Sequence, residues 1–350
     1  MKLGTGLRLI IGSIGLSACE AHFTPLAPDD TGPSDPQPVV TVDLASSTHA
    51  DLAVTSPDLA VKKSFHDQCL SDLPAGSAAA LPQYDQFNPI IGSHCKGTNQ
   101  QDITGVEKVV FVGDSVTVGT PPTPNDDFYR TILTQKLLDK FGQNIPVESC
   151  AAWGAETRDL IETGADQQLI QCFPALPEIR KTLFIMTLGG NDMYSMLKDS
   201  ATGKTLADMM ANSEAKAQNM RDAINWIKNP VNFPSGSYVI FANAYEFTDN
   251  TGDTASCPVA ALDKIPAASA DYRAAFLHFD EQYLKLAVDT GTDMIFLLEQ
   301  FCGHGYHKDD PTGVCYRGPN TDQYFDLTCI HPTPDGHQYL ADMFMAVVNE

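Results

Sequence analysis

The tripeptide Gly113-Asp114-Ser115 directly follows an unbroken apolar run, Val109–Val112. An uninterrupted run of Val and Phe is typical of a strand buried on both faces, as in a parallel sheet. A serine at the end of such a strand lies at the carboxyl edge of the sheet, where open α/β sheets bind ligands. Taken alone, the tripeptide is more typical of an ordinary βα turn, because Gly, Asp and Ser are all turn formers. Its interpretation depends on the segments that accompany it.

Three further segments carry the residue types that a nucleophilic serine needs. Gly154 follows a second strand candidate, Gly189-Gly190-Asn191-Asp192 follows a third, and His331 precedes the last predicted helix. A histidine activates a serine hydroxyl by accepting its proton. The backbone N–H groups of Ser115 and Gly154 and the amide of Asn191 are donors of the kind that stabilise an oxyanion. Because the loops after parallel strands gather at one edge, these residues are expected to meet there.

In this order and at this spacing, the four segments resemble those of the SGNH, or GDSL, hydrolases, a family of esterases and lipases. The resemblance covers residues 105–350 and implies a flavodoxin-like fold that hydrolyses esters without a metal. It also implies Ser115 as nucleophile, His331 as general base, and Gly154 and Asn191 as oxyanion donors beside the Ser115 N–H. Two alternatives are an acyltransferase on the same site and a non-catalytic cell-surface binding protein on a hydrolase scaffold. The presence of all four segments argues against the second.

The acid that supports the histidine is the point at which this chain departs from the family. The family usually places an aspartate three residues before the histidine, where this chain has Thr328, and Asp326 stands two residues earlier. The far imidazole nitrogen of His331 therefore has three candidate partners, namely the Asp326 carboxylate, the Thr328 hydroxyl and a backbone carbonyl. We expect Asp326, because a carboxylate best stabilises the imidazolium. A disulfide at Cys329 would pin a bulged loop that returns Asp326 to the histidine.

The other conspicuous polar residues have simpler interpretations. His337 falls on the first turn of the last predicted helix, where a surface or packing role is expected. His304 and His307 lie in a glycine-containing, cysteine-flanked loop that matches no metal-ligand motif. Asp114 and Asp192 are expected to hydrogen-bond neighbouring loop backbone. No G-x-G-x-x-G opens a helix after a strand, so a nucleotide cofactor is not expected, and the resemblance to the hydrolase family implies no metal.

Alternating strand and helix patterns must position these residues. The strand candidates are Val109–Val112, Pro146–Cys150, Thr182–Leu188, Tyr238–Asn243 and Met294–Leu298, and the helix candidates are Asp127–Phe141, Glu156–Gln171, Leu206–Ile227, Ala270–Val288 and Pro334–Val348. Asn125 or Asp126 is the expected N-cap of the first helix, and Gly142 its end. The pattern predicts an α/β fold: a flavodoxin-like three-layer α/β/α sandwich with a five-stranded parallel sheet.

The N-terminal region is typical of an exported protein. Basic residues precede a short apolar segment, Leu9–Leu16, which is too short to span a bilayer. The following Cys19 resembles the lipidated cysteine of bacterial lipoprotein signals, so residues 1–18 are expected to be a signal peptide. Residues 19–63 are rich in Pro, Asp, Ser and Thr and are predicted to be a disordered tether. Residues 64–104 are expected to form a loop-rich extension clipped to the main body by a disulfide.

The net charge and the cysteine content indicate which partners and which cellular compartment to expect. The net charge of −22 disfavours binding to nucleic acid phosphates. The nine cysteines indicate an oxidising compartment, and a bacterial cell-envelope location as an outer-membrane lipoprotein is expected. Removing Cys19 leaves an even number that can all pair. Cys69–Cys95 and Cys150–Cys172 are the expected first pairs, and Cys257, Cys302, Cys315 and Cys329 then pair in one of three ways.

Overall fold

The computed structural model describes residues 63–74, 80–161 and 167–350. The predicted signal peptide, Cys19 and residues 20–62 of the predicted tether lie outside these residues. The described chain contains a sheet of five strands in the order β2-β1-β3-β4-β5, and every neighbouring pair is parallel. The strands are β1 (Lys108–Gly113), β2 (Val147–Ser149), β3 (Thr182–Thr187), β4 (Ser237–Ala242) and β5 (Asp293–Ile295). This is the flavodoxin-like strand order, so the predicted fold class is confirmed.

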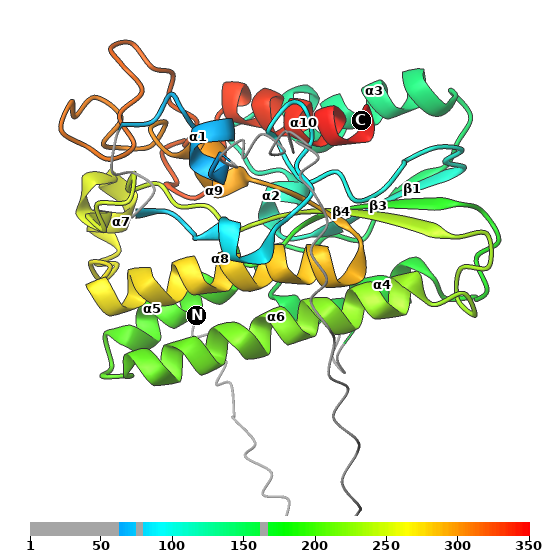
Figure 1. The fold of residues 1–350 in the computed structure, drawn as a ribbon, viewed down its shortest axis with the longest axis horizontal. Helices are drawn as coiled ribbons and strands as arrows, with labels where there is room; N and C mark the ends of the chain where they lie inside the picture. Colours follow the sequence, from blue (N-terminus) through cyan, green and yellow to red (C-terminus); the bar gives the residue numbers. More distant parts are fainter. Residues whose placement is uncertain (1–62, 75–79, 162–166) are drawn as a thin grey trace, which may run out of the picture. The chain divides into compact units, whose positions relative to one another are not determined.

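Helices cover both faces of the sheet (Figure 1). One face carries α3 (Tyr129–Phe141) and α10 (Pro334–Val348), and the other carries α5 (Gly190–Ser200), α6 (Leu206–Lys228) and α8 (Ala270–Thr290). The shorter helices are α1 (Phe65–Cys69), α2 (Ser115–Val118), α4 (Gln168–Cys172), α7 (Pro258–Leu262) and α9 (Leu297–Phe301), with 3₁₀ turns η2 (Tyr84–Phe87), η3 (Asn125–Asp127), η4 (Thr157–Leu160) and η5 (Thr254–Ser256).

Alternate residues of β1 enter opposite hydrophobic cores. Val109 and Phe111 join the core under α3 and α10, whereas Val110 and Val112 join the core under α6 and α8. All four side chains are fully buried, and burying a side chain of this size stabilises the fold by about 1.5–3 kcal/mol. The strand that leads into Ser115 is therefore held rigidly from both sides.

Several predicted elements differ from the structure at their ends. The apolar run Met294–Leu298 forms the end of β5 and then the start of α9, because such a run does not distinguish a buried strand from a buried helix. Within Glu156–Gln171, the described residues form η4 and the start of α4, with residues 162–166 outside the description. Phe128, not Asn125 or Asp126, is the N-cap of α3, because residues 125–127 form η3.

The extension before β1 is attached differently from the prediction. The Cys69–Cys95 disulfide closes a loop inside the extension and does not join it to the main body. The attachment comes instead from extended backbone: the Phe296 N–H donates to the Lys96 carbonyl at 2.9 Å, and the Thr98 N–H donates to the Met294 carbonyl at 2.9 Å. The extension therefore pairs with the edge strand β5, covers it and satisfies backbone groups at this edge of the sheet.

All eight cysteines of the described chain are paired. The two expected pairs, Cys69–Cys95 and Cys150–Cys172, are present, and the remaining four form Cys257–Cys329 and Cys302–Cys315. Four disulfides indicate an extracytoplasmic protein. Among the described residues, no helix combines the length and the hydrophobicity needed to cross a bilayer.

Candidate active site

Ser115 is positioned by the tight turn between β1 and α2. Gly113 has a φ of 150°, and a Cβ there would lie 2.6 Å from the Thr187 carbonyl oxygen, so only glycine allows β1 to pass this close to β3. Asp114 then caps α2 by accepting a hydrogen bond from the Val116 N–H at 3.0 Å. The strand order reverses between β1 and β3, and ligands bind at such switch points in open α/β sheets.

His331 reaches Ser115 from a segment far along the chain. A two-residue antiparallel bridge, Phe325 to Pro332, closes the segment just before α10. Across this bridge the Asp326 N–H donates to the His331 carbonyl at 2.9 Å. The imidazole Nε2 then lies 2.9 Å from Ser115 Oγ. The predicted nucleophile and the predicted base are therefore within hydrogen-bonding distance without any rearrangement.

The far nitrogen of the imidazole contacts the Thr328 hydroxyl, not a carboxylate. Nδ1 of His331 lies 2.7 Å from Thr328 Oγ1, which in turn lies 2.5 Å from Asp326 Oδ1. A carboxylate only accepts, so the single hydroxyl hydrogen of Thr328 goes to Asp326 and its lone pair accepts from Nδ1–H. That arrangement leaves Nε2 free to accept the proton of Ser115. The side chains of Ser115, His331, Thr328 and Asp326 form one directed hydrogen-bond chain, and we call the part of it behind His331 the relay.

The expectation that Asp326 contacts His331 directly is wrong, and the local backbone explains why. The Asp326 carboxylate also accepts the Thr328 N–H at 2.8 Å, which closes a tight turn two residues long. This turn directs the carboxylate onto Thr328 and away from the imidazole. Asp326 Oδ2 is buried and has no hydrogen-bond partner in the described chain.

Two tyrosines and a disulfide support this turn, and neither tyrosine belongs to a motif that would single it out in the sequence. The Tyr306 hydroxyl donates to the Asp326 carbonyl at 2.8 Å, and the Tyr245 hydroxyl donates to the Ile330 carbonyl at 2.7 Å. Cys329 adopts a φ of 73° and is bonded to Cys257. The bridged Cys329 thus pins a bulged loop, as expected, although the loop presents Thr328 to the histidine.

Two of the predicted oxyanion donors, Gly154 and Asn191, lie on segments that contact each other, the loop after β2 and the first turn of α5. Asn191 is in the first turn of α5, and its side-chain amide donates to the Ala155 carbonyl at 3.0 Å. The amide carries a second N–H that remains for a ligand. Gly154 precedes Ala155 and has a φ of 77°, a conformation that favours glycine. Ser115 and Asn191 line the same cleft, whose walls include Tyr194 and Tyr245.

Burial changes the ionisation of two groups beside the nucleophile. Desolvation lowers the pKa of His331 below its ordinary value of 6.5, and the negative charge of Asp326 opposes this shift. Desolvation raises the pKa of Asp114 to about 7, although the Val116 N–H and the Thr187 hydroxyl stabilise its charged form. The neutral, proton-accepting form of His331 therefore persists to lower pH than in a free histidine.

The pH dependence of kcat/KM follows from these shifts. Only neutral His331 accepts the serine proton, so activity should fall as pH drops through a midpoint below about 6.5. Asp114→Asn, which keeps a good helix cap, should retain this fall in activity at low pH, the acid limb of the profile, because the fall arises from protonation of His331. Asp326→Asn should move the midpoint of the residual activity lower still. A midpoint above 6.5, or a limb lost in Asp114→Asn, would contradict the assignment.

The other three histidines considered in the sequence analysis contact groups outside this hydrogen-bond chain. His337 is buried, and its Nδ1 accepts the Tyr129 N–H at 3.2 Å, so it packs as expected. His304 Nδ1 donates to the Asp322 carbonyl at 2.8 Å, and His307 contacts Asp253. Within residues 63–74, 80–161 and 167–350, no group of three or more His, Cys, Asp or Glu side chains is arranged to hold a metal ion.

Known structures resemble the chain only distantly. LAE5, an α/β hydrolase from the metagenome of Lake Arreo in Spain, is 15% identical, with a TM-score of 0.44 over 71% of this chain and 98% of its own. The acetyl xylan esterase AlAXEase is 17% identical, with a TM-score of 0.45 over 69% and 99%. The lipase Lip_vut3 from a goat rumen metagenome is 15% identical, with a TM-score of 0.45 over 69% and 96%.

Sequence comparison identifies the family. No match was found among curated proteins. The family model described as GDSL-like Lipase/Acylhydrolase matches residues 111–339, more than half of the chain. The matched region contains all four segments that suggested the resemblance, from Ser115 to His331. The protein therefore belongs to the GDSL-like lipase/acylhydrolase family of serine ester hydrolases.

Proposed function

We propose that this protein is a lipid-anchored, extracytoplasmic serine esterase that cleaves acyl esters through an acyl-enzyme intermediate. The observation that carries the proposal is the 2.9 Å contact between Ser115 Oγ and His331 Nε2. It is supported by the continuation of the same hydrogen-bond chain through Thr328 to Asp326. Ser115 lines a cleft, and a serine with an oriented histidine base is suited to nucleophilic attack on a carbonyl carbon.

The reaction proceeds in two halves. Ser115 Oγ attacks the ester carbonyl while His331 Nε2 takes its proton, and the carbonyl oxygen becomes an oxyanion. The Ser115 and Gly154 N–H groups and the Asn191 amide are the donors proposed to bind it. The C–O bond then breaks, and His331 returns the proton to the leaving alcohol. Water attacks the acyl-enzyme with His331 again as base, releasing a carboxylic acid and free Ser115.

A panel of esters tests the function directly. The full chain would be assayed on nitrophenyl esters of graded acyl length, on acetylated polysaccharide and on lipid esters, with Ser115→Ala as the control. We expect Ser115-dependent release of acid from at least one class. Transfer of the acyl group to an added alcohol in preference to water would make the protein an acyltransferase. Absence of any Ser115-dependent turnover would favour a binding protein on a hydrolase scaffold.

The proposed anchor makes a separate prediction. Several acyl chains at Cys19 would hold the protein firmly on a membrane, whereas one chain would not. In a bacterial host, the protein should therefore fractionate with the outer membrane, and Cys19→Ser should release it into the soluble extracytoplasmic fraction with activity retained. Equal distribution of the parent protein and the variant would contradict lipidation at Cys19. Cys19 lies outside the described residues, and the prediction is based on the sequence of the signal segment.

A further inference from the structure

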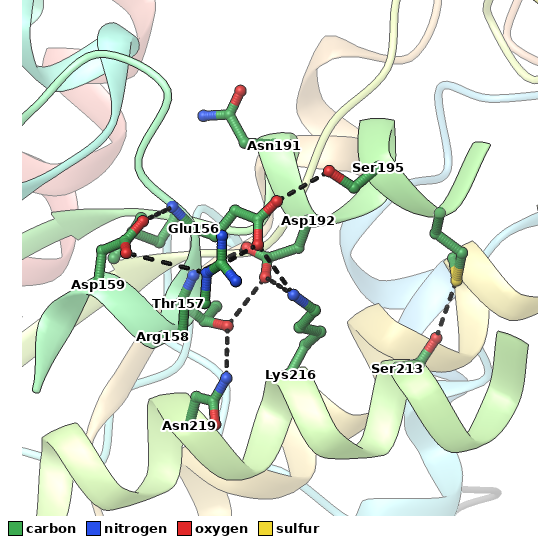
Figure 2. A network of polar contacts seen from close by, with 12 residues as sticks. Glu156, Thr157, Arg158, Asp159, Asn191, Asp192, Ser195, Ser213, Lys216 and Asn219 are labelled. Carbon is green, nitrogen blue, oxygen red and sulfur yellow. Dashed lines mark hydrogen bonds and ion pairs between the residues drawn. The ribbon is translucent and has the colours of Figure 1, made fainter. Parts of the chain in front are cut away.

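A polar network links residues 156–157, which follow Gly154, to the first turns of α5, which carry Asn191 (Figure 2). At its centre is Lys216 of α6, whose Nζ lies 3.2 Å from Asp192 Oδ1 and 3.0 Å from Glu156 Oε2. The Asp192 side chain is fully buried, and those of Lys216 and Glu156 are 15% and 14% exposed. One cation thus bridges two largely buried carboxylates.

Each of these carboxylates also binds the other loop. Asp192, the residue after Asn191, accepts the backbone N–H and the hydroxyl of Thr157, each at 3.0 Å. Glu156, two residues after Gly154, accepts the hydroxyl of Ser195 in α5 at 2.8 Å. The two connections run in opposite directions between the Gly154 loop and α5. Together they fix the spacing between Gly154 and Asn191.

The electrostatics make Lys216 necessary to this arrangement. Burial raises the pKa of Asp192, and the charge of Lys216 opposes that shift. Burial alone would lower the pKa of Lys216, yet Asp192 and Glu156 together raise it above its ordinary value, so the ammonium stays charged. Arg158 also pairs with Glu156, at 3.4 Å from a side chain that is 60% exposed. Asp192 has no second cation among the described ion pairs, so without Lys216 its buried carboxylate would face Glu156 unpaired. The loops would then separate or one carboxylate would take up a proton.

We propose that Lys216 is a positioning residue for the oxyanion hole, acting through Asp192 and Glu156 to hold Gly154 and Asn191 at the correct separation. This inference rests on the proposed esterase function. Oxyanion donors act mainly on the transition state, so their misplacement lowers kcat more than it raises KM. Displacements of about 1 Å in a site can cost about 10²-fold in rate.

The test is a double-mutant cycle on the full chain with the best ester from the panel. Lys216→Met should lower kcat by about 10- to 100-fold with KM within about twofold. Lys216→Arg, which keeps the charge, should recover most of that loss. In an Asn191→Ala background, Lys216→Met should cost less than about threefold, because the separation that Lys216 sets no longer matters once the Asn191 amide is gone.

Arg221→Met is the matched control, since Arg221 is a cation of the same helix that pairs with Asp289 at 2.8 Å on α8. It should lower thermal stability without lowering kcat. If Lys216→Met does not fold, Thr157→Val tests the same connection without removing a charge. An equal loss in both Asn191 backgrounds, or a kcat equal to that of the parent, would overturn the inference while leaving Ser115-dependent turnover intact. No Ser115-dependent turnover in the parent would overturn the proposed function and this inference with it.

Discussion

Ser115→Ala should lower kcat by about 10⁶-fold while leaving the fold intact, as is typical when the nucleophile of a serine triad is removed. The hydroxyl lies on the first residue of α2, 2.9 Å from His331 Nε2, and in the proposed mechanism it forms the covalent bond to the ester carbon. The cap of α2 comes from Asp114, so the turn does not depend on the serine side chain. Steady-state hydrolysis by the purified variant, with circular dichroism to verify folding, measures this.

His331→Ala is the companion to this experiment. In the proposed mechanism the nucleophile and its base act as one unit, so the single variants and the double variant should lose similar amounts of activity. If the two residues acted independently, the fold-losses in activity of the two single variants would multiply in the double variant. A double variant far weaker than either single variant would show that Ser115 and His331 do not act together, and turnover near the parent level in Ser115→Ala would rule out the serine.

The second large effect should come from the relay behind the histidine. Thr328→Val removes the acceptor for His331 Nδ1–H without changing side-chain volume much, and it also separates Asp326 from the imidazole. Neutralising the acid of a triad can cost about 10⁴-fold, so we expect Thr328→Val and Asp326→Asn each to lower kcat by about 10²- to 10⁴-fold. Thr328→Ser, which keeps the hydroxyl, should stay within about tenfold of the parent.

The chain offers a matched control for this relay. Asp310 accepts the Thr312 N–H at 2.9 Å and the Thr312 hydroxyl at 2.7 Å, which is the same turn away from the histidine. Thr312→Val and Asp310→Asn should leave kcat unchanged. The double variant Asp326→Asn/Thr328→Asp puts a carboxylate three residues before His331 and should recover activity relative to Asp326→Asn. Parent-like kcat in Thr328→Val would show that the hydroxyl is not needed.

The sequence was sufficient for the parts of the fold that depend on apolar periodicity. The run at Val109–Val112 and its counterparts in β3 and β4 are buried on both faces, so their composition alone indicates a parallel sheet. The residues after these strands then had to share one edge of the sheet, which is why Ser115 and Asn191 line one cleft. The ends of β5 and α9 were not predictable, because an apolar run has no period that separates a buried strand from a buried helix.

The relay was not predictable because it depends on a turn two residues long. Spacing identified both Asp326 and Thr328 as candidates, and charge favoured Asp326. The choice between them is made by the Thr328 N–H, which binds the carboxylate and turns it away from the imidazole. Lys216 was missed for a related reason: it lies on α6, and nothing in the local sequence shows that it meets Asp192 and Glu156.

The most direct test of the central claim is covalent labelling by a fluorophosphonate, followed by peptide mapping. The reagent reacts only with a serine that is activated by its base, and its phosphoryl oxygen occupies the place of the oxyanion. The structure predicts one label per chain, located on Ser115, with labelling abolished in Ser115→Ala and strongly slowed in His331→Ala. No label on the folded parent chain, or a label on a residue other than Ser115, would contradict the assignment of Ser115 as the nucleophile.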